Sequence, residues 1–228
     1  CQCRRQRQMC IRDSRYDYLG EERYSATYLM TELDIGPNLN VLTGFRNEKN
    51  ITSYFSKSSL DHALAHWILV HEDTKHRREN SFVLPALFVN YKPLPWLTIK
   101  AAQTRTLTRP DYSSIIPLIR ANGSAKTLDW RNKTLEPGLS NNTDLSISLL
   151  DDKLGLLTIN YFQKSIKDLI YSSGSRIYFD EDTTNFGISS DYVNFKILNY
   201  ELNNPNRVNL KGWEIDYQTR FWYLPGAL

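Results

Sequence analysis

The sequence predicts an all-β protein whose antiparallel, up-and-down strands form part of the wall of a transmembrane β-barrel. Three observations predict this class: segments of alternating apolar and polar residues, short turns in succession with long polar connections, and no apolar run long enough for a membrane-spanning helix. A barrel strand shows only every second side chain to lipid, so its hydrophobic signal is weak. The 228 residues are 41% hydrophobic and 12% aromatic, which excludes a disordered chain.

The first 14 residues differ from the rest of the chain. They hold all three cysteines and four arginines but one acidic residue, Asp13. Their string RRQRQMCIRDS resembles translated sequencing adapter, so we treat residues 1–14 as a non-native leader, expected to be unpaired, and residues 15–228 as the barrel segment. Without the leader the net charge falls from +3 to 0, which removes any basic stripe for nucleic acid, and no cysteine remains for a disulfide.

Strands are predicted from alternation. In the clearest segment, Trp213, Ile215 and Tyr217 fall on one face of an extended strand and Glu214 and Asp216 on the other. Other segments alternate less regularly, and residues 82–91 are apolar on both faces. Seven wall strands are expected at roughly 22–35, 39–50, 81–91, 96–109, 139–150, 155–170 and 207–223.

The connections are the stronger evidence for a barrel. Glycine, proline, asparagine and aspartate mark short turns at 36–38, 92–95, 151–155 and 224–226. Long polar connections are expected at roughly 51–80, 110–140 and 172–205, with an additional hairpin arm at 191–202. Bacterial outer-membrane barrels combine short periplasmic turns with long extracellular loops. They also have an even number of strands, usually at least eight, so we expect this chain to be a fragment.

Five runs of the sequence, in this order, resemble the C-terminal half of TonB-dependent receptors, particularly those of the Bacteroidota. The runs are YSATYLMTELDIGPNLNVLTGFRNE, LPALFVNYKPLPWLTIKAAQTRTLTRPDY, LEPGLSNNTDLSISLL, GLLTINYFQKSIKDLIY and LKGWEIDYQTRFWYLPGAL. The resemblance implies a barrel of twenty-two strands in the outer membrane of a Gram-negative cell, with a plug inside it. It also implies uptake of a scarce ligand: a ferric siderophore, another metal complex or an oligosaccharide.

The partners implied by this resemblance are the TonB complex, a small extracellular ligand, outer-membrane lipid and, for glycan uptake, a SusD-like lipoprotein. In the family, TonB acts through the plug and a short TonB box, and neither is visible in this chain. No cofactor is implied.

All four histidines fall within the connection at 51–80. His62 and His66 are spaced so that they would share one face of a helix, where two imidazoles can chelate a divalent metal. The alternative is a polar loop whose histidines face water.

Charged residues supply the other candidates for ligand contact. Arg109 closes the fourth strand, and Asp111 lies at the start of the long loop after it. Arg109 could meet an anionic ligand or pair with a neighbouring carboxylate. Glu136 is likewise either a ligand contact or one half of a structural ion pair. A further set is expected to face the lumen, where it would line a wet interior, contact the plug or touch ligand. This set is Arg46, Glu48, Glu214, Asp216 and Arg220.

Aromatic residues in the loops, such as Trp67, Tyr112 and Trp130, either contact ligand or pack within the loops. The carboxylate pairs Asp151–Asp152 and Glu214/Asp216 invite a glycosidase reading, but a tight turn and a strand face explain them as solvated groups, and no enzyme is expected. The rival class is a soluble all-β carbohydrate-binding module. A barrel leaves Ile215, Tyr217 and Phe221 facing outward from a single sheet, whereas a sandwich buries them between two sheets.

Overall fold

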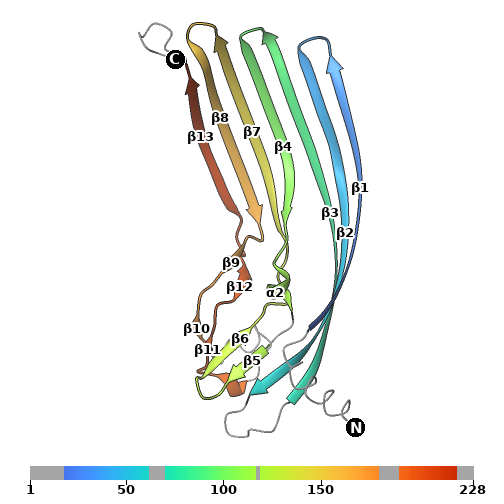
Figure 1. Ribbon diagram of the computed structural model, residues 1–228, viewed down its shortest axis with the longest axis vertical. Helices are drawn as coiled ribbons and strands as arrows, with labels where there is room; N and C mark the ends of the chain where they lie inside the picture. Colours follow the sequence, from blue (N-terminus) through green and yellow to red (C-terminus); the bar gives the residue numbers. More distant parts are fainter. Residues whose placement is uncertain (1–17, 62–69, 117–118, 180–189, 220–228) are drawn as a thin grey trace, which may run out of the picture.

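A computed structural model describes residues 18–61, 70–116, 119–179 and 190–219 of the chain. Its main feature is one long, curved antiparallel sheet in which successive wall strands are neighbours (Figure 1). The seven wall strands are β1 (Tyr18–Ile35), β2 (Leu39–Asp61), β3 (Val70–Leu94), β4 (Leu97–Thr108), β7 (Gly138–Asp151), β8 (Gly155–Lys167) and β13 (Val208–Gln218). The predicted class and number of wall strands are therefore confirmed.

The short turns lie together at one end of the sheet (Figure 1). Two turns form where they were predicted, at residues 36–38 and 152–154, and Gly36 adopts a φ of 63° that suits glycine. The predicted turn at 92–95 is displaced, because β3 continues to Leu94 after an irregularity in register and the turn falls on Pro95 and Trp96. The turn predicted at 224–226 lies outside the described residues, as does the leader at 1–14.

The long connection predicted at 51–80 is wrong for most of its length. β2 runs on to Asp61 and β3 begins at Val70, and the two strands pair as far as Leu60 and Val70. Polar residues occupy both faces of this extension, so hydrophobic alternation gave no strand signal there.

Short elements fill the other two connections, at the end of the sheet opposite the turns (Figure 1). They are α2 (Tyr112–Ile115), β5 (Ile119–Asn122), β6 (Thr127–Trp130), β9 (Ile170–Ser172), β10 (Arg176–Ile177), the 3-10 helix η3 (Ser190–Tyr192), β11 (Lys196–Ile197) and β12 (Glu201–Asn203). None of the described helices is long and apolar enough to cross a membrane.

These short strands continue the wall. β5 pairs in parallel with the far end of β2, next to the stretch of β2 that pairs with β1, and the order then continues through β6 and β11 to β10. The hairpin arm predicted at 191–202 does not pair with itself. Instead β11 pairs with β10 and β6, and β12 pairs with β9, so the two ends of the last connection run side by side.

Candidate functional site

The two faces of the wall differ in chemistry. On one face, cross-strand neighbours form apolar rows from strand to strand, and we call this the outer face. One such row is Ile99, Ile147, Ile159 and Ile215. Trp213 and Ile215 are 70% and 71% exposed, and the ring centroids of Trp213 and Tyr161 lie 4.8 Å apart. An apolar face with aromatic residues, left uncovered, is what a lipid-facing wall presents.

The sandwich alternative is not favoured, because Ile215 and Tyr217 are exposed rather than packed against a second sheet. In the described part of the chain, the second sheet consists of β9 and β12 alone. Phe221, the third side chain of this test, lies outside the described residues.

The opposite face, here called the inner face, is hollow. A concavity of about 640 Å³ extends from β2 across β3, β4, β7 and β8 to β13. Its charged members are Lys100, Asp144, Lys164 and Glu214. Glu214 therefore lies where the sequence predicted a lumen-facing residue, and Asp216 shares its parity on β13.

The inner face also carries an apolar hollow of about 320 Å³. Met30, Leu42, Leu84 and Phe88 line it, together with Gly44. This hollow explains why residues 82–91 are apolar on both faces: one set faces outward with the apolar rows and the other lines the inner hollow.

Two arginines share one carboxylate on the inner face. Arg46 Nε and Arg109 Nη2 each lie 2.5 Å from an oxygen of Glu48, whose side chain is buried. The Tyr24 hydroxyl accepts a hydrogen bond from Arg46, and the Arg109 guanidinium lies 5.0 Å from the centre of the Tyr24 ring. The structural pair considered for Arg109 is thus present. Two guanidiniums carry ten N–H donors, more than one carboxylate can accept, so the cluster retains donors for an anion.

A second polar contact joins β1 to the segment after β4. The Tyr112 hydroxyl, at the start of α2, donates to Glu22, and the Asn50 side chain donates to the other oxygen of the same carboxylate at 2.5 Å. The hydrogen bond to Glu22 and the negative charge of Glu22 raise the pKa of Tyr112. Asp111 caps the same short helix through its backbone carbonyl, which accepts from the Ser114 N–H, and its side chain is exposed.

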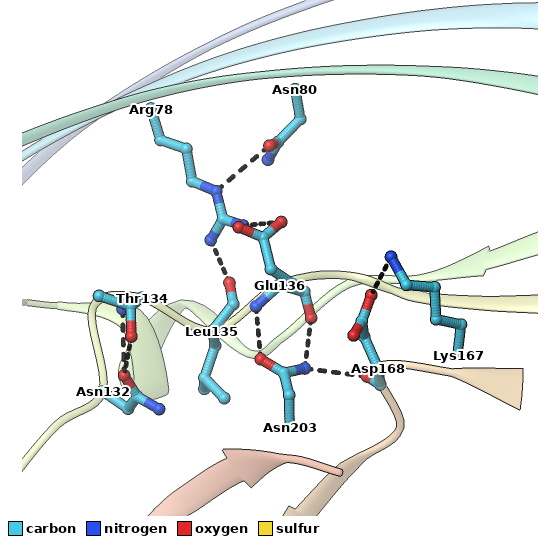
Figure 2. Close-up of polar contacts among 9 residues, drawn as sticks. All are labelled: Arg78, Asn80, Asn132, Thr134, Leu135, Glu136, Lys167, Asp168 and Asn203. Carbon is cyan, nitrogen blue, oxygen red and sulfur yellow. Dashed lines mark hydrogen bonds and ion pairs between the residues drawn. The ribbon is translucent and has the colours of Figure 1, made fainter. Parts of the chain in front are cut away.

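Figure 2 shows how the segment before β7 is held against β3. The Arg78 guanidinium pairs with the Glu136 carboxylate, donates to the Leu135 carbonyl and donates to Asn80 at 3.2 Å. Leu135 is fully buried in a small cluster with Tyr54 and Ile115. One arginine therefore fixes both the backbone and a side chain of this segment.

Asn203, in β12, ties the two long connections together (Figure 2). Its side chain accepts from the Glu136 N–H at 2.7 Å and donates to the carbonyls of Glu136 and Asp168. Asn132 adds a bond of 3.1 Å to the Glu201 carbonyl. The two connections therefore form one braced unit at the end of the wall opposite the turns.

Trp130 lies in the core of this unit. It is 7% exposed and meets the Tyr200 ring edge-on at 5.9 Å. The same cluster holds Tyr178, Tyr192 and Ile197. This placement favours the packing role for Trp130 over direct ligand contact.

The remaining predicted residues divide in two. His62, His66, Trp67 and Arg220 lie outside the described residues, within which no group of three histidine, cysteine or acidic side chains could hold a metal. Asp151, by contrast, ends β7 at the turn, where its carboxylate accepts hydrogen bonds from the N–H groups of Lys153 and Leu154.

Sequence reasoning missed Tyr24, Arg78 and Asn203. Tyr24 was within reach, because it shares the inner parity with Glu22 on β1. Arg78 was assigned to a loop, and its parity on β3 becomes meaningful once the strand extension is known. Asn203 carries no sequence signal for its role.

A family model described as "TonB dependent receptor-like, beta-barrel" matches residues 7–228, a match that begins inside residues 1–14. No curated protein matches the sequence. Among solved structures, the Serratia marcescens hemophore receptor HasR, in complex with its hemophore HasA and heme, has a TM-score of 0.61 at 14% identity, over 86% of this chain and 31% of that one.

The ferric-catecholate import receptor Fiu from E. coli K12 is also similar, with a TM-score of 0.52 and 14% identity, over 87% of this chain and 25% of that one. At this identity the two structures show a shared fold. The chain spans between a quarter and a third of the length of these two structures.

Proposed function

Since the chain belongs to the TonB-dependent receptor family, through its β-barrel domain, we propose that it forms part of the wall of a receptor that takes up a scarce ligand. Family members are outer-membrane proteins of Gram-negative bacteria, and this chain is one of them. The observation that carries the proposal is the division of the sheet into an apolar outer face and a hollow, charged inner face. A transport wall needs both.

In the proposed orientation, the short turns face the periplasm, and the braced unit formed by the two long connections faces the cell exterior. The Arg46–Glu48–Arg109 cluster then lies on the inner face towards the exterior, where an incoming ligand arrives first. We assign Arg109 as its anion contact, with Asp111 beside it at the start of α2. Arg220, which the sequence predicts to face the lumen, is a further candidate. Ferric siderophores, other metal complexes and acidic oligosaccharides all present anionic oxygens to such a site.

Energy for uptake would come from the TonB complex, acting through a plug domain and TonB box in the remainder of the receptor. A SusD-like lipoprotein is the partner expected if the ligand is a glycan. No catalytic step is proposed, because the candidate residues bind and position rather than react.

The test uses a complete receptor that carries this chain, in detergent micelles and in cells. Binding is measured for ferric catecholate, heme and a panel of acidic and neutral oligosaccharides, and uptake is compared with and without TonB. We expect TonB-dependent uptake of one class. Arg109→Gln is expected to weaken binding of that ligand about tenfold, because one charge-assisted contact is lost.

Arg105→Gln is the matched control, since Arg105 lies near the same end of β4 and its side chain bonds Asn141 at 2.9 Å on the outer face. This variant should bind like the parent protein. Equal losses in both variants would contradict the assigned role of Arg109. TonB-independent uptake would contradict the proposed function.

A further inference from the structure

Basic side chains gather on the outer face of β1, β2 and β3, beyond the apolar rows. The cross-strand rows, read away from the turn, begin as apolar sets such as Leu33, Val41 and Val89. The row of Leu29, Phe45 and Pro85 is still apolar. The chemistry then changes within a few residues to lysine, arginine and glutamate.

The height of this change matches the edge of a bilayer. Ten residues separate Ile35, beside the turn, from Ser25, which is the partner of Lys49. At about 3.3 Å a residue and a tilt of about 40°, the row of Ser25 and Lys49 stands about 25 Å above the turn, which is the height of the apolar band of outer-membrane barrels. The charged rows beyond it therefore lie at the level of the lipid headgroups.

A shallow groove of about 220 Å³ lies among these charged rows. Arg23, Lys75 and Arg77 line it, with Glu21, Ile51 and Ser53. Lys49 lies one row nearer the apolar band, where its ammonium meets Glu79 at 2.5 Å. Four basic groups face two acidic groups here, and the Arg23 side chain is 76% exposed although its Nε bonds Glu21 at 2.8 Å.

We propose that this groove binds the phosphate of a lipid headgroup in the outer leaflet. Guanidinium groups pair with phosphate through charge-assisted hydrogen bonds, and a surface cation attracts anionic lipid most strongly at the membrane face. A lipid is the occupant, rather than a free anion, because the apolar row of Leu29, Phe45 and Pro85 lies on the same face six residues of β2 from Ile51 towards the turn, where acyl chains would lie. The inference uses the proposed orientation but concerns the face opposite the ligand site.

The test measures lipid binding to the complete receptor by native mass spectrometry in detergent, with bis-phosphorylated lipid A, the same lipid without phosphate, and inorganic phosphate as probes. We expect the phosphorylated lipid to bind best. Arg23→Gln with Arg77→Gln should weaken its binding about thirtyfold, because each basic group near an anionic surface contributes about fivefold. Glu79→Gln releases Lys49 from its ion pair and should strengthen binding.

The matched control is Lys92→Gln with Lys153→Gln, which removes two exposed positive charges at the turn end. It should bind lipid like the parent protein. Equal binding of the two double variants would overturn the proposal, and so would equal binding of the lipid with and without phosphate. Saturation by inorganic phosphate at the same concentration would assign the groove to a soluble anion. None of these results depends on ligand uptake.

Discussion

The guanidinium of Arg78 in β3 holds the backbone carbonyl of Leu135 and the carboxylate of Glu136, so one side chain of the wall positions the segment that leads into β7. The Arg78 side chain is 14% exposed, whereas that of Glu136 is 58% exposed. The contact with the Leu135 carbonyl is thus the more enclosed of the two. Asn203 then links this segment to the last connection, because its side chain bonds the Glu136 N–H and the Asp168 carbonyl.

Arg78→Gln should release this segment without unfolding the wall. Loss of hydrogen bonds to a charged, largely enclosed group costs about 2 kcal/mol locally, which corresponds to an increase of about thirtyfold in amide exchange. Hydrogen exchange measured by mass spectrometry should show the increase at residues 132–137 and, through Asn203, at residues 168–172 and 201–203.

Arg77→Gln is the control for this prediction, because Arg77 is the chain neighbour of Arg78 and lies on the outer face. Its exchange pattern at residues 132–137 should match that of the parent protein. If Arg78→Gln leaves these amides equally protected, burial of Leu135 alone holds the segment.

Ionisation of Tyr112 should occur above the ordinary tyrosine pKa of about 10, because its hydroxyl donates to the charged Glu22 carboxylate. The raised pKa determines the direction of the pH dependence. The stabilisation of the fold by this contact is present below the ordinary tyrosine pKa and is lost as pH rises through the pKa of Tyr112 in the folded protein. Tyrosinate absorbance of the parent protein minus that of Tyr112→Phe isolates this group. Glu22→Gln removes the charge and should lower the midpoint, and a midpoint that is unmoved by this change would contradict the assignment.

Gly44 should tolerate no side chain, because the backbone of β1 lies close beside it at Leu29 and Met30. A Cβ at this position would lie 2.3 Å from the Leu29 carbonyl oxygen and 3.0 Å from the Met30 Cα, and both are backbone atoms that cannot rotate away. Gly44→Ala is expected to destabilise the folded barrel by about 1–3 kcal/mol, seen as a lower temperature of unfolding in detergent. Thr27→Val, an isosteric change on exposed β1, should leave it unchanged; equal temperatures for all three proteins would show that β1 can shift aside.

Local signals in the sequence were sufficient to predict the strands of the wall within the membrane. Alternation needs a water-facing and a lipid-facing side, so β13 and β7 could be predicted from their own residues. The same logic failed for β2 beyond residue 50, where Ser53, Ser56 and Lys57 give the sequence no apolar alternation.

The candidate site was partly predictable for the same reason. Arg46 and Glu48 share a parity, so their common inner face follows from the strand alone. The pairing of Glu48 with Arg109 depends on where the chain goes after β4, and the Arg78–Glu136 contact joins two connections that the sequence could treat only separately. Such contacts arise from strand order and loop path, not from local pattern.

The assignment of the two faces can be tested most directly at two adjacent residues of β13. Ile215 is 71% exposed on the outer face, and its neighbour Glu214 lines the hollow of the inner face. An arginine that faces lipid near the bilayer midplane costs about 2–4 kcal/mol, whereas one in a wet lumen is tolerated. Ile215→Arg should therefore reduce the amount of folded, protease-resistant receptor in the outer membrane, and Glu214→Arg should leave it close to the parent level. Both variants introduce the same side chain one residue apart on one strand, so the size and charge of the introduced group are matched. If Glu214→Arg proved the more damaging, the inner and outer faces would have to be exchanged, and the ligand site and the lipid groove with them.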